Sequence, residues 1–183
     1  MNQLNQSQNK KCIKYKLVDV TNNIIPCIKP IKAIAFFNGQ INGIVTFEED
    51  IYNDIININV DLKGFIPNTK HGFHVHEAGD LSKGCASMCA HFNPFGKKHG
   101  GRNDFERHVG DLGNIVAGTD GCARETFSDN LIKLRGDIAN VIGRGLIIHE
   151  DEDDCGKGGN EESLKTGNAG KRIACGIIGY VSC

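Results

Sequence analysis

A period of two in side-chain polarity constrains the fold of this chain more than any other feature of its sequence. It is clearest in residues 55–62 (IININVDL), where apolar and polar side chains alternate. Such alternation indicates a strand with one buried face and one solvated face. No segment of the sequence shows a sustained period of 3.6 residues. We therefore predict an all-β protein.

Further short strands are expected on both sides of this one. The 23 glycines, four prolines and the Asn38-Gly39 pair favour tight turns between them. Many short strands at such spacing are typical of β-sandwiches and barrels. Two long glycine-rich segments, residues 78–110 and 150–171, are expected to be functional loops. The expected strands are residues 31–37, 43–48, 55–62, 71–77, 112–117, 125–127, 130–134, 141–149 and 172–181.

Length and charge exclude several classes of protein. A chain of 183 residues fits one domain, which we expect over residues 29–183. Residues 1–28 form a polar N-terminal extension, expected to be partly disordered, in which residues 18–28 could add a short strand or lie along the surface. A net charge of −1 argues against nucleic-acid binding, and no apolar run is long enough to span a membrane. The N-terminus lacks the apolar core of a secretory signal, so a cytoplasmic or intracellular location is expected.

Histidines are concentrated in one stretch of the chain. Residues 72–111 contain five of the seven, and His74 and His76 are spaced to point to one face of a strand. His91, His99 and His108 follow in a glycine-rich segment that Asp111 closes. Imidazole is the commonest ligand for copper and zinc, and zinc also accepts a carboxylate. The stretch therefore predicts a metal site.

Six sequence motifs extend this prediction to a family. The segments GFHVHE, HFNP, KHGG, RHVGDLGN, GLIIH and GKRIACG occur in that order from about residue 30 to the C-terminus. The chain in this range closely resembles the copper, zinc superoxide dismutases. The resemblance implies an eight-stranded Greek-key β-sandwich or flattened barrel, immunoglobulin-like, with two long functional loops. It also implies one copper and one zinc per subunit.

The resemblance assigns a role to each residue of the expected metal site. His91 would bridge the two metals, and Asp153 would accept hydrogen bonds from His74 and His99 and so couple the two sites. His71 matches a structural histidine. The implied copper ligands are His74, His76, His91 and His149, and the implied zinc ligands are His91, His99, His108 and Asp111.

The implied reaction converts superoxide to oxygen and hydrogen peroxide by cycling of copper between Cu(II) and Cu(I). His91 would take a proton when it releases copper. Arg172 matches the arginine that guides the anion to the copper. The family's electrostatic loop matches Glu161, Glu162 and Lys165, which would shape the field at the channel mouth.

Cysteines and one alanine bear on maturation and assembly. Cytosolic thiols are normally reduced, so only the resemblance implies a Cys85–Cys175 disulfide. The other six cysteines are expected to be buried apolar residues or exposed free thiols. Ile173 stands where chaperone-dependent members often carry proline, which favours maturation without the copper chaperone. A homodimer is expected although Ala78 replaces a frequent aromatic residue of the dimer contact.

Two other classes of function could use a similar domain. A metallochaperone with a dismutase-like domain needs a separate module with a close cysteine motif, which neither end of this sequence supplies. A structural or metal-buffering protein does not need the complete ligand set together with Arg172. The enzyme hypothesis is therefore preferred.

Overall fold

The computed structural model describes residues 29–182, so the predictions made for residues 1–28 and for Cys183 lie outside the described residues. Almost all of the regular structure is β-strand, which confirms the predicted fold class. The elements are β1 Lys32–Asn38, β2 Asn42–Asp50, β3 Ile55–Lys63, β4 Lys70–His76, β5 Ser82–Cys85, the 3-10 helix Ala86–Met88, β6 Asp111–Val116, β7 Cys122–Asp129, β8 Gly145–His149, α1 Ser163–Thr166 and β9 Arg172–Tyr180.

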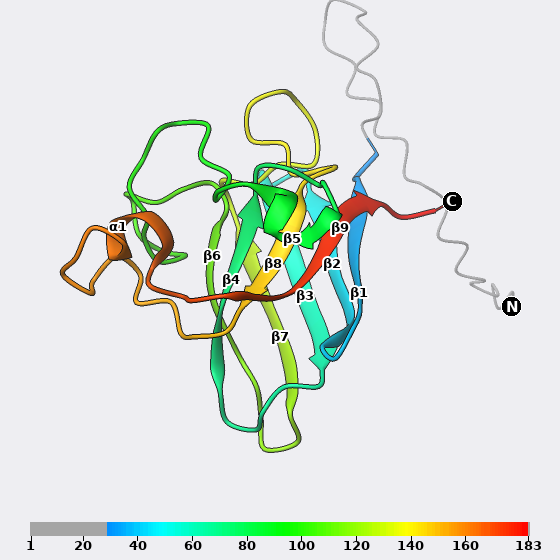
Figure 1. Cartoon of the computed structure of the whole chain (residues 1–183). Coiled ribbons are helices and arrows are strands. Elements are labelled where there is room, and N and C mark those ends of the chain that lie inside the picture. The colour runs from blue at the N-terminus through cyan, green and yellow to red at the C-terminus, as the bar shows by residue number, and fades with distance from the viewer. Residues whose placement is uncertain (1–28, 183) are drawn as a thin grey trace, which may run out of the picture.

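Eight of these strands form one antiparallel sheet in the order β6-β4-β8-β9-β1-β2-β3-β7. Strand β9 joins its two halves, because Ile177 pairs with Gly145 of β8 and Ile178 pairs with Ala35 of β1. The sheet curls so that its edge strands β6 and β7 come into contact, giving a nearly closed barrel (Figure 1). The short β5 lies outside this sheet.

The core fills the interior of the barrel. In β3, Ile56, Ile58, Val60 and Leu62 are buried while the side chains between them are more exposed, as the period of two predicts. Each such side chain contributes about 1.5–3 kcal/mol when it is fully buried. Strand β4 is different, because all of its residues after Lys70 are buried. One face of β4 is therefore covered by something other than the core.

The two predicted long loops provide that cover. The segments 77–110 and 150–171 leave the ends of β4 and β8 and lie on the same side of the barrel, where α1 projects (Figure 1). A disulfide between Cys85 and Cys175 joins the first loop to β9, as the resemblance implied. None of the helices in residues 29–182 has the length and apolar character that crossing a membrane requires.

Two predicted strands were wrong in whole or in part. Residues 130–134 form no strand, because the Asp129 side chain accepts hydrogen bonds from the N–H groups of Leu131 and Ile132 and turns the chain. Strand β8 begins at Gly145 rather than at residue 141, because the Asn140 side chain accepts from Ile142 N–H and holds the preceding segment in a turn.

Candidate metal centre

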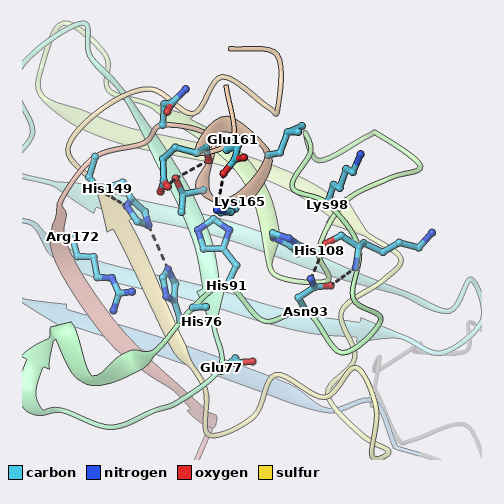
Figure 2. A pocket seen from close by; sticks show the side chains of 17 residues that line it. His76, Glu77, His91, Asn93, Lys98, His108, His149, Glu161, Lys165 and Arg172 are labelled. Atoms are coloured by element: carbon cyan, nitrogen blue, oxygen red, sulfur yellow. Dashed lines mark hydrogen bonds and ion pairs between the residues drawn. The ribbon is translucent and has the colours of Figure 1, made fainter. Parts of the chain in front are cut away.

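Four histidines meet on the outer face of β4 and β8. Strand β4 directs His74 and His76 to this face, and His149 ends the neighbouring strand β8. The first loop returns beside β4 through an isolated bridge between His76 and His91. One ring nitrogen from each of the four lies within 4.8 Å of the others, and Figure 2 shows three of these rings facing the same space. These are the four residues expected at copper.

A second group lies directly against the first and shares both His74 and His91 with it. It joins His74, His91, His99 and Asp111, whose ligand atoms are also within 4.8 Å of one another. His108 approaches the same carboxylate, with Nδ1 3.1 Å from Asp111 Oδ1. On the other side His91 Nδ1 lies 2.9 Å from that oxygen. The three histidines expected at zinc therefore converge on the fourth expected ligand, Asp111.

Unpartnered nitrogens test whether these residues fit metal ions. His74 Nδ1, His91 Nε2 and His99 Nδ1 are buried and have no hydrogen-bond partner. His99 Nδ1 lies 3.0 Å from Asp111 Oδ1, but without hydrogen-bond geometry. A buried polar atom without a partner costs about 1–3 kcal/mol. Coordination would satisfy these atoms, and imidazole with carboxylate is a donor set suited to copper and zinc.

Hydrogen bonds to backbone carbonyls fix the orientation of the His76 and His149 rings. His76 Nδ1 donates to Cys89 O at 2.9 Å, and His149 Nδ1 donates to Gly170 O at 3.1 Å. Both histidines therefore keep Nε2 as the free nitrogen that faces the centre. The two Nε2 atoms are 3.4 Å apart, and both rings point into the pocket (Figure 2).

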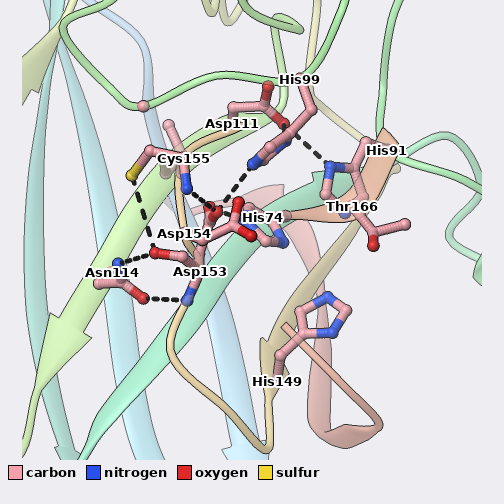
Figure 3. A network of polar contacts seen from close by, with 12 residues as sticks. His74, His91, His99, Asp111, Asn114, His149, Asp153, Asp154, Cys155 and Thr166 are labelled. Atoms are coloured by element: carbon pink, nitrogen blue, oxygen red, sulfur yellow. Dashed lines mark hydrogen bonds and ion pairs between the residues drawn. The ribbon is translucent and has the colours of Figure 1, made fainter. Parts of the chain in front are cut away.

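Asp153 links the two groups of ligands. Its carboxylate is buried and accepts hydrogen bonds from His74 Nε2 and His99 Nε2, both at 2.8 Å (Figure 3). The Asn114 side chain fixes the Asp153 backbone, accepting from its N–H and donating to its carbonyl, both at 2.8 Å. A histidine held in this way by a carboxylate has a defined tautomer and a more basic ligand nitrogen.

The protonation states suit metal binding. Burial lowers the pKa of His74 to about 3 and that of His149 to about 4, so both rings are neutral at pH 7. Burial opposes ionisation of Asp111, but its close contacts with the rings of His108, His91 and His99 hold its pKa far below the usual range. Burial would also lower the pKa of His99, but contact with Asp111 and Asp153 raises it to about 9. A metal cation would displace that proton, because only neutral imidazole coordinates.

An open cavity of about 990 Å³ leads from solvent to the histidines. Arg172 lines it beside His76 and His149 (Figure 2). Its guanidinium donates from Nη1 to Cys85 O at 2.8 Å and from Nη2 to Cys89 O. The expected electrostatic-loop residues, which also line the cavity, are Glu161, Glu162 and Lys165. His71 belongs to neither group and donates from Nδ1 to the carbonyl of His149 at 2.8 Å.

Three charged residues of the cavity wall were missed from the sequence, namely Glu77, Lys97 and Lys98. The sequence did contain a signal for them, because Glu77 directly follows His76 and the two lysines directly precede His99.

Comparison with known proteins agrees with this geometry. The family model described as copper/zinc superoxide dismutase matches residues 41–178. This chain belongs to that family. The superoxide dismutase [Cu-Zn] of Paramecium bursaria Chlorella virus 1 is 55% identical over 166 residues, covering 90% of this chain and 87% of the relative. That of Yarrowia lipolytica is 52% identical over 154 residues, covering 83% of this chain and 99% of the relative.

Comparison of the fold with solved structures supports the same family. The crystal structure of the clock protein EA4 has a TM-score of 0.80 and 43% identity, covering 86% of this chain and 99% of that one. As a member of the copper/zinc superoxide dismutases, this chain is an oxidoreductase with copper and zinc as cofactors and superoxide as substrate. The resemblance that the motifs suggested is confirmed.

Cys89 was missed as a residue of this dismutase centre. Its backbone has φ 61° and ψ −151°, a conformation that is essentially restricted to glycine. Its carbonyl accepts hydrogen bonds from both His76 and Arg172. The backbone strain at Cys89 is therefore located where its carbonyl orients both His76 and Arg172.

Replacing Cys89 by glycine is expected to stabilise the protein. The strain relieved is about 1–3 kcal/mol, and the added freedom of glycine in the unfolded chain costs about 0.5–1 kcal/mol. The free energy of unfolding of Cys89→Gly, measured in denaturant on the metal-free protein with its disulfide intact, should rise by about 1 kcal/mol. The matched control Cys122→Gly, in strand β7, should lower it. A Cys89→Gly protein less stable than its parent would contradict the role of strain.

Proposed function

We propose that His74, His76, His91 and His149 hold the copper, that His91, His99, His108 and Asp111 hold the zinc, and that superoxide is disproportionated at the copper. His74 and His91 both belong to the two groups of potential ligands. His74 Nε2 is hydrogen-bonded to Asp153, which leaves His74 one nitrogen for a metal, so the observation that carries this assignment is the position of His91 between the groups. Its Nδ1 faces Asp111 while its Nε2 is buried without a partner. One ring is thus available to both metals.

The chain's own residues would bind the two metals, orient the ligand rings and supply protons to the product. Bound copper supplies one-electron chemistry by cycling between Cu(II) and Cu(I), and zinc, which has no redox activity, supplies a fixed charge. Two superoxide anions and two protons give oxygen and hydrogen peroxide. His91 is placed to hold one of these protons at Nε2, and water in the open cavity would supply the other. Asp153 keeps His74 and His99 oriented throughout.

Arg172 would guide the anion into the centre. Its guanidinium lies at the end of the cavity nearest His76 and His149, and its contacts with the Cys85 and Cys89 carbonyls leave its charge unneutralised by any carboxylate in residues 29–182. Glu161, Glu162 and Lys165 would shape the field farther out, where Lys165 Nζ lies 3.5 Å from Glu161 Oε2.

Removing this positive charge is expected to slow capture of superoxide. The second-order rate constant of Arg172→Ile should fall by about 10-fold, because focusing of this kind raises on-rates by about 10 to 10³-fold. Arg172→Lys should recover part of the loss, and the dependence of rate on ionic strength should be weaker in Arg172→Ile. Arg124→Ile removes the same charge from the outer surface of β7 and should change the rate less than twofold. Equal rate constants for the two isoleucine variants would contradict guidance by Arg172.

We propose that the chain forms a homodimer and that the outer face of β1, β2 and β9 is the contact between its two copies. Phe36 is 62% exposed, its direct partner Ile44 on β2 is 36% exposed, and Ile177 on β9 is 38% exposed. Apolar patches of this kind mark protein contacts. Gly79, the residue after Ala78, lies against the Ile177 side chain, so position 78 is next to this surface.

Sedimentation equilibrium of the metal-loaded protein with its disulfide intact is expected to give a mass of two chains. Ile177→Asp should shift the population toward monomer, because a charge would be buried at the contact. Lys83→Asp, on the exposed β5, is the control and should leave the dimer intact. A wild-type protein that is monomeric at all concentrations tested would contradict the assembly.

Residues 29–183 are assigned to one dismutase domain. Lys29 is the first described residue and its carbonyl accepts from Arg135, while Ile31 N–H donates to Glu49 at 3.0 Å, so the chain is already attached to the barrel there. A cytoplasmic location, maturation without a copper chaperone and the absence of nucleic-acid and membrane partners complete the proposal. The net charge of −1 supports the absence of nucleic-acid partners. Maturation without the chaperone is supported by Ile173, which stands two residues before Cys175, where chaperone-dependent members often carry proline.

A further inference from the structure

The barrel has an open seam between its edge strands β6 and β7, which are not hydrogen-bonded to each other. On β6, Asn114 pairs with Gly72 of β4, but Gly72 donates its N–H to Asp151 O at 2.8 Å. The carbonyl of Asn114 therefore points away from β4 and toward the seam. The carbonyl of Leu112 also faces the seam, because both carbonyls accept from the same side chain there.

One side chain from the first loop fills this seam. Arg102 donates from Nε to Leu112 O at 2.7 Å and from Nη2 to Asn114 O at 3.3 Å. Its guanidinium carbon lies 3.3 Å from the centre of the Phe127 ring on β7. Its Nη1 is 3.9 Å from Glu125 Oε2, and the second oxygen of that carboxylate is buried without a partner. Arg102 thus contacts both strands that the sheet leaves unpaired.

The same side chain is connected to the metal centre by two routes. Along the chain, Arg102 stands three residues after His99 and six before His108. Through space, its partner Asn114 holds the backbone of Asp153, whose carboxylate accepts from the His99 ring (Figure 3). Gly100 N–H, two residues before Arg102, donates to Asp111 Oδ2 at 3.1 Å. The loop and the strand that supply the centre therefore meet at this arginine.

We propose that Arg102 is a positioning residue for the zinc site, holding the loop that carries His99 and His108 against β6 and β7. A guanidinium suits this task because it is planar, donates to two carbonyls at once and stacks on an aromatic ring. The inference rests on the proposed assignment of His99 and His108 to zinc. It concerns the rate at which zinc leaves the site rather than the chemistry at copper.

The test compares the release of the two metals from the fully loaded protein. Zinc and copper dissociation rates are measured separately with chromogenic chelators in Arg102→Met, which keeps an apolar side chain but no donor. Zinc release should be about tenfold faster, as when an outer partner of a metal ligand is lost, while copper release changes less than twofold. Arg102→Lys should fall between, and Arg124→Met, an exposed arginine on β7, should equal the wild type.

A milder variant keeps the test valid if Arg102→Met does not fold. Phe127→Leu removes only the ring under the guanidinium and should speed zinc release two- to fivefold. Zinc release in Arg102→Met and Phe127→Leu equal to that of Arg124→Met, or equal acceleration of both metals, would overturn the role of Arg102. Zinc release that fails to respond to His108→Ala would instead overturn the ligand assignment on which the inference rests.

Discussion

His149→Ala is expected to reduce superoxide consumption to the uncatalysed background while zinc remains bound. His149 is one of only four imidazoles in the copper group, and it does not belong to the group around Asp111. Loss of a residue that merely orients a ligand typically costs 10- to 100-fold in metal affinity or activity, so loss of a ligand should cost more than about 100-fold. The measurements are copper and zinc content per chain and the rate of superoxide disappearance in the same sample.

The reciprocal variant provides the control. His108→Ala should lower zinc content while the four histidines of the copper group are unchanged, because His108 contacts Asp111 and belongs only to the zinc side. A His149→Ala protein that keeps its copper and more than a tenth of its activity would show that this residue is not a copper ligand.

Cys85→Ser is expected to have the largest effect on stability. The Cys85–Cys175 disulfide closes a segment with a sequence separation of 90, which in the chain-entropy model is worth about 4–5 kcal/mol. Denaturant unfolding of the metal-free protein should show a loss of this order. Both metals should also leave faster, because Cys85 O is a partner of Arg172 and the disulfide holds the first loop to β9.

Cys122→Ser is the matched control for this change. Cys122 is a free, half-buried thiol in β7, and its replacement should lower the free energy of unfolding by less than about 1 kcal/mol. Metal retention in Cys85→Ser that equals retention in Cys122→Ser would mean that the loop keeps its place without the disulfide.

Local patterns in the sequence were sufficient for most of the fold. Strand β3 alternates between core and solvent, so its period of two is visible in residues 55–62. The turn after Asp129 was not predictable, because it depends on that side chain capping two backbone N–H groups. Strand β5 (SKGC) was missed for another reason. It is four residues long, mostly exposed and outside the main sheet, so it carries no pattern of burial.

The candidate ligands were predictable because their residue types are distinctive and fall in the family's order. The contacts that orient these ligands were only partly predictable from the sequence. Asp153 came from the resemblance, whereas Cys89 acts through its carbonyl, and every residue type has a carbonyl. Arg102 is recognisable only once the unpaired edges of β6 and β7 are known. Contacts made to backbone atoms leave no signature in a single sequence.

Superoxide consumption by the metal-loaded chain, with copper content measured in the same preparation, tests the proposed copper–zinc centre most directly. The rate is expected to rise in proportion to bound copper, to be lost when a chelator removes copper, and to return when copper is restored. Zinc alone should give no activity, because it has no redox chemistry. A rate at background level in protein with full copper occupancy at His74, His76, His91 and His149 would contradict the account.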